Sequence, residues 1–153
     1  MTVPSGINLI FHSVRPGGGM ERYVLDLIAG IARRGMRVRV VTRRLDWPGL
    51  RPDGVEFVVV PDRTPFSRLN NYRFEARACR HIQPDWPTIG ISRVPGCADL
   101  AIVGGTHIGH LQDKGKVRPG LFDRLTIRHE QALYEHARSI VADRKSTRLN
   151  SSH

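Results

Sequence analysis

Apolar residues gather in short blocks between polar or glycine-rich segments, and each block predicts one element of secondary structure. The nearly continuous apolar run Ile7–Phe11 predicts a buried strand, because a Pro-Gly loop follows it at once. Val38–Thr42 predicts a second strand, and Val55–Val60, stopped by Pro61, predicts a third. Further short strands are expected over Thr88–Ser92, Leu100–Val103 and Ile140–Ala142. Most of the predicted strands are therefore short and continuously apolar, as in a buried sheet.

Helical spacing fills three of the intervals between these strands. The first predicted helix carries one apolar face, made by Met20, Val24, Leu27, Ile28 and Ile31. It ends at Gly35, which stands where a left-handed C-terminal cap belongs. A second helix is expected from a Ser67 cap to about His81, with its buried stripe at Leu69, Tyr72, Ala76 and Cys79. A third is expected over roughly Leu121–Arg138, and the alternation predicts a three-layer α/β domain with a mainly parallel sheet.

The loop Pro16–Gly19 joins the first strand to the first helix and is the strongest candidate for chemistry. Glycines there let a ligand approach the main chain and leave free N–H groups at a helix N-terminus for phosphate or sugar oxygens. The loop lacks the Gly-Lys-Ser/Thr of a phosphate-binding Walker loop, and Arg22 occupies the position of the third glycine in the dinucleotide fingerprint. A glycine-rich turn with no ligand is the alternative.

The segment RPGGGMERYVLDLIAGIARRGMRVRVVT resembles the opening of family 4 glycosyltransferases, with its Gly-Gly-x-Glu/Gln-Arg-type loop and its helix before an R-G-H-x-V-x-V strand entry. Met36 stands where the family commonly has histidine. The likeness is greatest to the lipopolysaccharide core glucosyltransferase I group and is most specific over 16–42 and 93–142. It implies the GT-B arrangement of two Rossmann-like domains, of which this chain covers most of the first, acceptor-side domain.

The resemblance also implies site residues. Gly17, Gly18 and Gly19 would approach the nucleotide-sugar donor, with UDP-glucose as an example, while Glu21 and Arg22 would help to seat the acceptor. Glu21 has a simpler explanation, because an acidic residue in a first helical turn is favoured by the helix dipole alone.

Two further candidates follow later strands. His107 would lie near the transferring sugar; the alternative is a solvated loop histidine. His107 and His110 could form a metal pair, but no carboxylate or cysteine cluster completes a site, so no metal is expected. The turn of Arg93, Pro95 and Gly96 could hold a phosphate or sugar hydroxyl, or be an ordinary surface turn.

The chain is strongly basic, with 24 Lys and Arg against 14 Asp and Glu, a net charge of +10. An anionic partner fits this charge: a phosphorylated glycan, or the inner membrane leaflet in peripheral contact. A solvated face is the plainer explanation, and nucleic acid is unlikely because aromatic residues suited to base stacking are absent from the basic clusters. His129 and His136 are expected to flank the packed stripe of the last helix and need no ligand.

The cysteines and the N-terminal residues indicate in which cellular compartment the protein is expected. Cys79 and Cys97 form no C-x-x-C motif, and MTVPSG lacks the charged and apolar parts of a signal peptide, so buried thiols in a reducing cytoplasm are expected. No apolar run approaches the roughly 20 residues of a membrane span. The domain is therefore expected to be cytoplasmic and, if membrane is involved, to lie on its surface.

Residues 143–153, DRKSTRLNSSH, match one reading frame of a widely used sequencing adapter and are interpreted as an artefact. Without their three basic residues and one acidic residue, 1–142 keeps a net charge of +8. We therefore expect 1–142 to be an incomplete glycosyltransferase domain, inactive alone because the donor-binding domain is absent. The alternative is a stand-alone Rossmann-like module for an anionic ligand such as a nucleotide or nucleic acid. A dinucleotide oxidoreductase ranks third, because of Arg22.

Overall fold

The computed structural model describes residues 4–92, 96–103 and 120–142. Predicted features at 93–95, 104–119 and 143–153, including the adapter-like segment, lie outside them. In chain order the elements are β1 (Gly6–Ile10), β2 (Ser13–Val14), α1 (Gly19–Arg33), β3 (Arg37–Thr42), β4 (Arg44–Leu45), β5 (Val55–Val59), α2 (Ser67–Arg77), the 3-10 turn η1 (Ala78–His81), β6 (Thr88–Gly90), β7 (Leu100–Val103), α4 (Leu121–His136) and β8 (Ser139–Ala142).

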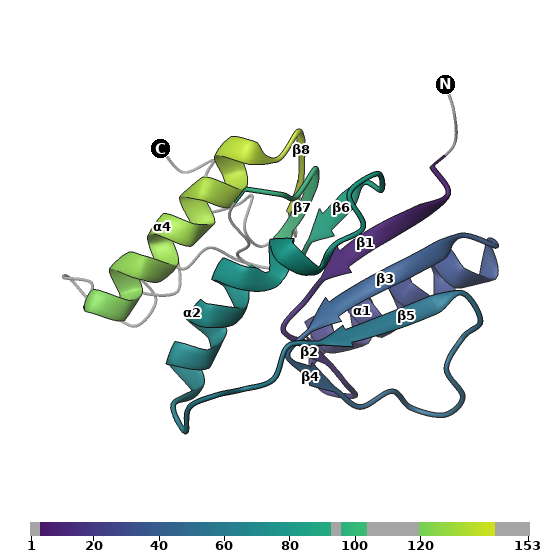
Figure 1. Ribbon diagram of the computed structural model, residues 1–153, viewed down its shortest axis with the longest axis horizontal. Coiled ribbons are helices and arrows are strands. Elements are labelled where there is room, and N and C mark those ends of the chain that lie inside the picture. Colours follow the sequence, from purple (N-terminus) through teal and green to yellow (C-terminus); the bar gives the residue numbers. More distant parts are fainter. Residues whose placement is uncertain (1–3, 93–95, 104–119, 143–153) are drawn as a thin grey trace.

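One six-stranded sheet organises the domain, in the order β5-β3-β1-β6-β7-β8. Every pair of neighbouring strands in it is parallel. The chain builds outward from β1 to β3 and β5, and then returns through α2 to place β6 on the other side of β1 (Figure 1). This is the Rossmann order, and its reversal makes a topological switch point between β1 and β6. The predicted α/β fold class is confirmed.

The two faces of the sheet are covered by different helices. Leu9 and Val40 pack with Val24 and Ile28 of α1. Their neighbours along the strands, Ile10 and Val41, point to the opposite face, where they pack with Phe74 of α2 and Ala78 of η1. Leu133 of α4 packs on this second face, against Ala101. Helices α2 and α4 therefore lie together on one side and α1 on the other, which gives three layers (Figure 1).

The first half of the chain follows the sequence prediction closely. In α1, Val24 and Ile28 are fully buried, and Met20, Leu27 and Ile31 are partly buried against the same cluster. Gly35 has φ +79°, in the left-handed region expected of its cap position. The Arg43–Gly54 loop contains a feature that was not predicted: β4 pairs with β2 in a separate two-stranded sheet. Two residues on each side are too few to leave a periodic pattern.

The second helix departs from its prediction. Ser67 is the first helical residue and not the cap; Phe66 holds that position without a side-chain hydrogen bond. The α-helix ends at Arg77, and η1 carries the chain to His81. The buried face is not the predicted stripe of Leu69, Tyr72, Ala76 and Cys79 but consists of Asn70, Phe74, Glu75 and, in η1, Ala78. An apolar stripe was the wrong criterion here, because two of the buried residues are polar and have partners inside the protein.

The prediction of two free thiols is wrong. Cys79 of η1 and Cys97, which precedes β7, form a disulfide with 18 residues of sequence separation. Their spacing contains no motif that could reveal the pairing; it depends on η1 lying beside the β6–β7 connection, which a tertiary contact decides. The cysteines therefore no longer argue for a reducing compartment. None of the described helices is long and apolar enough to cross a membrane.

Candidate functional site

The carboxyl ends of the parallel strands meet at one edge of the sheet, which is where α/β domains bind ligands. Four described segments leave the strands at this edge. They are 11–18 after β1, Arg43 after β3, 60–66 after β5 and Ile91–Ser92 after β6. The edge therefore brings the glycine loop near several polar side chains.

His12 and Ser92 meet at the switch point itself. The His12 amide donates a hydrogen bond to Ser92 Oγ at 2.9 Å, and His12 Nδ1 lies 3.1 Å from the same oxygen. The His12 carbonyl accepts hydrogen bonds from the amides of Arg43 and Arg44, at 3.3 and 3.1 Å. One residue thus joins the ends of β1, β3 and β6. Sequence reasoning named neither His12 nor Ser92; the only available signal was that each follows a buried strand.

The glycine loop begins α1 on this edge. Gly18 is the N-cap with extended backbone (φ −69°, ψ −167°), and its carbonyl accepts the Arg22 amide at 3.1 Å. A Cβ on Gly17 would lie 3.2 Å from Glu21 Cγ, whereas one on Gly19 would have no described atom within 4 Å. None of Gly17, Gly18 and Gly19 has a positive φ. The described backbone therefore does not require glycine at Gly19, and a ligand could approach there.

Glu21 changes what this loop can bind. A Cβ on Gly18 would lie 3.3 Å from Glu21 Oε2, so the carboxylate sits over the loop and faces the helix N-terminus. This position fits the dipole explanation, and it also places an acceptor of hydrogen bonds beside Gly17 and Gly18 of the loop. A phosphate would be repelled by the carboxylate, whereas a sugar hydroxyl could donate to it. Arg22 is exposed on the same turn.

The other predicted site residues are only partly described. Arg93, Pro95 and His107 lie outside the described residues. Gly96 has φ +91°, a conformation that favours glycine for backbone reasons alone, and its neighbour Cys97 is linked to η1. Among the predicted residues that are described, only Gly17, Gly18, Gly19, Glu21 and Arg22 form one contiguous group. Over the described ranges, no three His, Cys, Asp or Glu side chains gather in a way that could hold a metal ion.

With this geometry, comparison with known proteins identifies the class. The family model described as Glycosyltransferase Family 4 matches residues 17–149, so the chain belongs to that family. It is 34% identical over 141 residues to a probable transglycosylase of Burkholderia thailandensis, covering 89% of this chain and 38% of that protein. It is 27% identical over 137 residues to the lipopolysaccharide glucosyltransferase WaaG of Escherichia coli, covering 88% and 34%.

A solved structure confirms the fold. The crystal structure of WaaG, a glycosyltransferase involved in lipopolysaccharide biosynthesis, matches with a TM-score of 0.65 and 22% identity, over 88% of this chain and 37% of that one. The resemblance noted in the sequence, to family 4 and to the lipopolysaccharide core glucosyltransferases, is confirmed. The chain nevertheless spans only 38% and 34% of the length of these two relatives, so their activities are those of longer proteins.

Proposed function

We propose that this chain is the N-terminal, acceptor-side domain of a retaining glycosyltransferase that moves a sugar from a nucleotide-sugar to a glycan or lipid-linked acceptor. Family membership supports the reaction class. The main structural support for the role of this domain is the glycine loop at the carboxyl edge. At Gly19 the loop has open space beside it, and the described backbone conformation does not itself require glycine there. The names of the two relatives suggest glycan synthesis, with lipopolysaccharide core and UDP-glucose as the first acceptor and donor to test.

The chemistry assigned to this edge is sugar positioning. In the proposed reaction the bond between the donor sugar and the nucleoside diphosphate breaks while an acceptor hydroxyl attacks the same face, and the hydroxyl proton passes to the departing diphosphate oxygen. Glu21 would accept a hydrogen bond from a sugar hydroxyl beside Gly19, and the free amides of the first turn of α1 would donate to oxygen atoms of the ligand. His12 and Ser92 would provide fixed polar atoms at the switch point. The diphosphate charge would be neutralised mainly by a second domain.

Because sugar positioning is assigned to this domain and diphosphate binding to a second one, we predict that the 153-residue chain binds sugar but transfers none. The binding test is saturation-transfer NMR of the purified chain with UDP-glucose and with a delipidated core oligosaccharide. The variant Gly19→Gln places a side chain in the open space of the loop. Its matched control is Gly30→Gln, at the other end of α1, where an added Cβ also meets no described atom. Both variants should fold, because glutamine favours helices over glycine.

Loss of the saturation signals in Gly19→Gln with retention in Gly30→Gln is the expected result. Equal signals in both variants would remove the glycine loop from the binding site. Sugar transfer by the chain alone would contradict the assignment of the donor machinery to a second domain.

The name of the Burkholderia relative gives a second candidate, a transglycosylase that moves sugar between glycans without a nucleotide. The same NMR experiment separates the two. Binding of the oligosaccharide with no response to UDP-glucose, and product formation by the complete protein from a glycan donor, would favour the transglycosylase. A requirement of the complete protein for the nucleotide-sugar would favour the first proposal.

A further inference from the structure

A cavity with a polar lining lies between the end of β5 and the helix α2. Its volume is about 280 Å³, near the lower end of the roughly 300–1,000 Å³ of small-molecule sites. Its basic lining is five arginines, Arg43, Arg63, Arg73, Arg77 and Arg80. One carboxylate, Asp62, also lines it, which leaves a net charge of +4 with His81 neutral. We call this cavity the arginine pocket.

Arg43 is the fixed member of the set. Its side chain is only 4% exposed, and it donates hydrogen bonds to the Ser67 carbonyl at 3.0 Å and to Ser67 Oγ at 3.4 Å. Its Nε lies 3.3 Å from Asp62 Oδ1, close enough for an ion pair but without hydrogen-bond geometry. Burial lowers the pKa of the Arg43 guanidinium from its usual value, and the charge of Asp62 opposes this. Among the described residues, the buried Nε–H of Arg43 therefore has the Asp62 carboxylate as an ionic neighbour but no hydrogen-bond acceptor.

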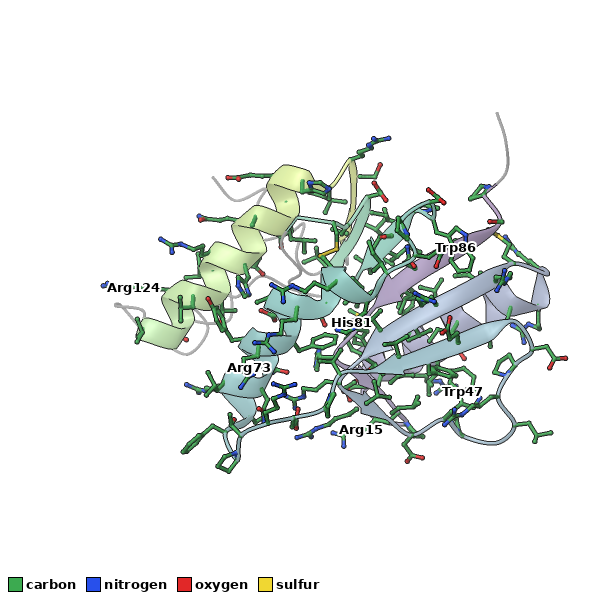
Figure 2. The ribbon with its side chains drawn as sticks, viewed as in Figure 1. Arg15, Trp47, Arg73, His81, Trp86 and Arg124 are labelled. Carbon is green, nitrogen blue, oxygen red and sulfur yellow. A yellow bond between two sulfur atoms is a disulfide. The ribbon has the colours of Figure 1, made fainter. Side chains whose placement is uncertain are left out.

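The other four arginines have no such anchor. Arg63, Arg77 and Arg80 are exposed and Arg73 is half-buried. Across the described part of the chain, no hydrogen bond or ion pair engages their guanidinium groups. Figure 2 labels Arg73 on α2 and His81 at the end of η1, which mark the helical wall of the pocket. Val59, Val60 and Phe74 supply an apolar side to the pocket.

This arrangement is unfavourable while the pocket holds only water. Five guanidinium groups around one small space repel one another, and a single carboxylate offsets only one of them. An anion with several oxygens would satisfy several N–H groups together, because the guanidinium fork matches the geometry of phosphate. The pocket also differs from a solvated basic face in being concave and partly apolar, so it selects a small projecting group over a flat surface.

We infer that the arginine pocket binds the phosphate monoester of a small ligand, with Arg43 at its base and Arg63 and Arg73 at its rim. A phosphorylated sugar and a lipid phosphate headgroup share this chemistry. The pocket adjoins the carboxyl edge, because the Arg43 amide donates to the carbonyl of His12 at 3.3 Å. The inference does not depend on the proposed transfer reaction and would hold for a binding module.

The test uses the 153-residue chain and the double variant Arg63→Gln/Arg73→Gln. Its control, Arg33→Gln/Arg34→Gln, removes the same charge at the far end of α1, where both side chains are exposed. Inorganic phosphate and glucose 1-phosphate are titrated by calorimetry against chloride at equal ionic strength. A second arm measures co-sedimentation with vesicles of phosphatidylcholine alone and with phosphatidic acid added.

The wild-type chain should bind phosphate or glucose 1-phosphate, and the pocket variant should lose at least about tenfold in affinity, whereas the control should stay within about twofold. Without ligand, the pocket variant should melt no lower than wild type, because the substitution relieves repulsion. Pocket-dependent binding confined to phosphatidic acid vesicles would support the site and assign the headgroup as its ligand. No binding in either arm, or equal losses in both double variants, would overturn the inference.

Discussion

Replacing His129 by alanine removes one half of a buried pair that joins α2 to α4. His129 Nδ1 lies 2.7 Å from Glu75 Oε2, and the two side chains are 9% and 10% exposed. The imidazole also stacks on Tyr72, with ring centroids 4.6 Å apart and an interplanar angle of 8°. These two contacts anchor α4 to α2 on this face of the sheet.

The expected cost follows from these contacts. A hydrogen bond to a charged group contributes about 1.5–3 kcal/mol, and its loss leaves the Glu75 carboxylate buried without this donor. The lost stacking adds roughly 0.5–1.5 kcal/mol. His129→Ala should therefore lower the free energy of unfolding by about 3 kcal/mol. Glu75→Ala should cost less, because it leaves the stacking of His129 on Tyr72 in place.

Urea unfolding of both single variants and of the double variant gives the coupling energy between the two side chains. We expect about 1.5–3 kcal/mol. His136→Ala is the matched control, because His136 is exposed on the same helix, and it should change stability by less than about 0.5 kcal/mol. A coupling energy below about 0.5 kcal/mol would refute the claim that this pair joins the helices, whatever the single variants cost.

Three other predictions concern stability. Asn8→Ala should lower the free energy of unfolding in urea by about 2–4 kcal/mol. The buried Asn8 side-chain amide donates to the Gln83 carbonyl, accepts from the Gln83 amide and also donates to Trp86 and Thr88. A cost below about 1 kcal/mol would show that these hydrogen bonds contribute little. Reduction of the Cys79–Cys97 disulfide should cost about 3 kcal/mol, and an unchanged melting temperature in dithiothreitol would restore the expectation of two thiols. Gly35→Ala should cost about 1–2 kcal/mol in the same assay because φ is +79°, whereas a gain in stability would contradict that conformation.

The pattern of apolar and polar residues predicted the helices and strands well where neighbouring residues in the sequence determine them. The first helix, its apolar face and its glycine cap were all predicted, and β7 was predicted with its observed bounds. The prediction failed at α2, where the buried face carries Asn70 and Glu75. Glu75 is buried because His129, 54 residues later, supplies its partner. No periodicity in a single sequence contains that information.

The candidate site, like the fold, was predictable only where residues close together in the sequence form it. The glycine loop could be found because a strand, a glycine run and a helix follow one another directly. His12 and Ser92 could not, because their contact spans 80 residues and depends on the sheet order. The arginine pocket brings together Arg43, which follows β3, the end of β5 with the segment after it, α2 and η1, whereas along the chain its arginines belong to separate stretches.

Two of the polar contacts that sequence reasoning missed, those of Asn8 and of His12, share one location, the seam between β1 and β6. The two strands are distant in sequence and pair through only three residues each, so backbone hydrogen bonds alone hold them weakly. Asn8 binds the segment before β6, and His12 binds Ser92 beyond its end, so side chains reinforce the seam on both sides of the switch point. A binding site at this seam would have rigid structural support. The proposed sugar transfer needs such support to hold the donor and acceptor sugars in a fixed relative position. Under the proposed function, the residues that stabilise this seam would also hold the carboxyl edge in place for a ligand.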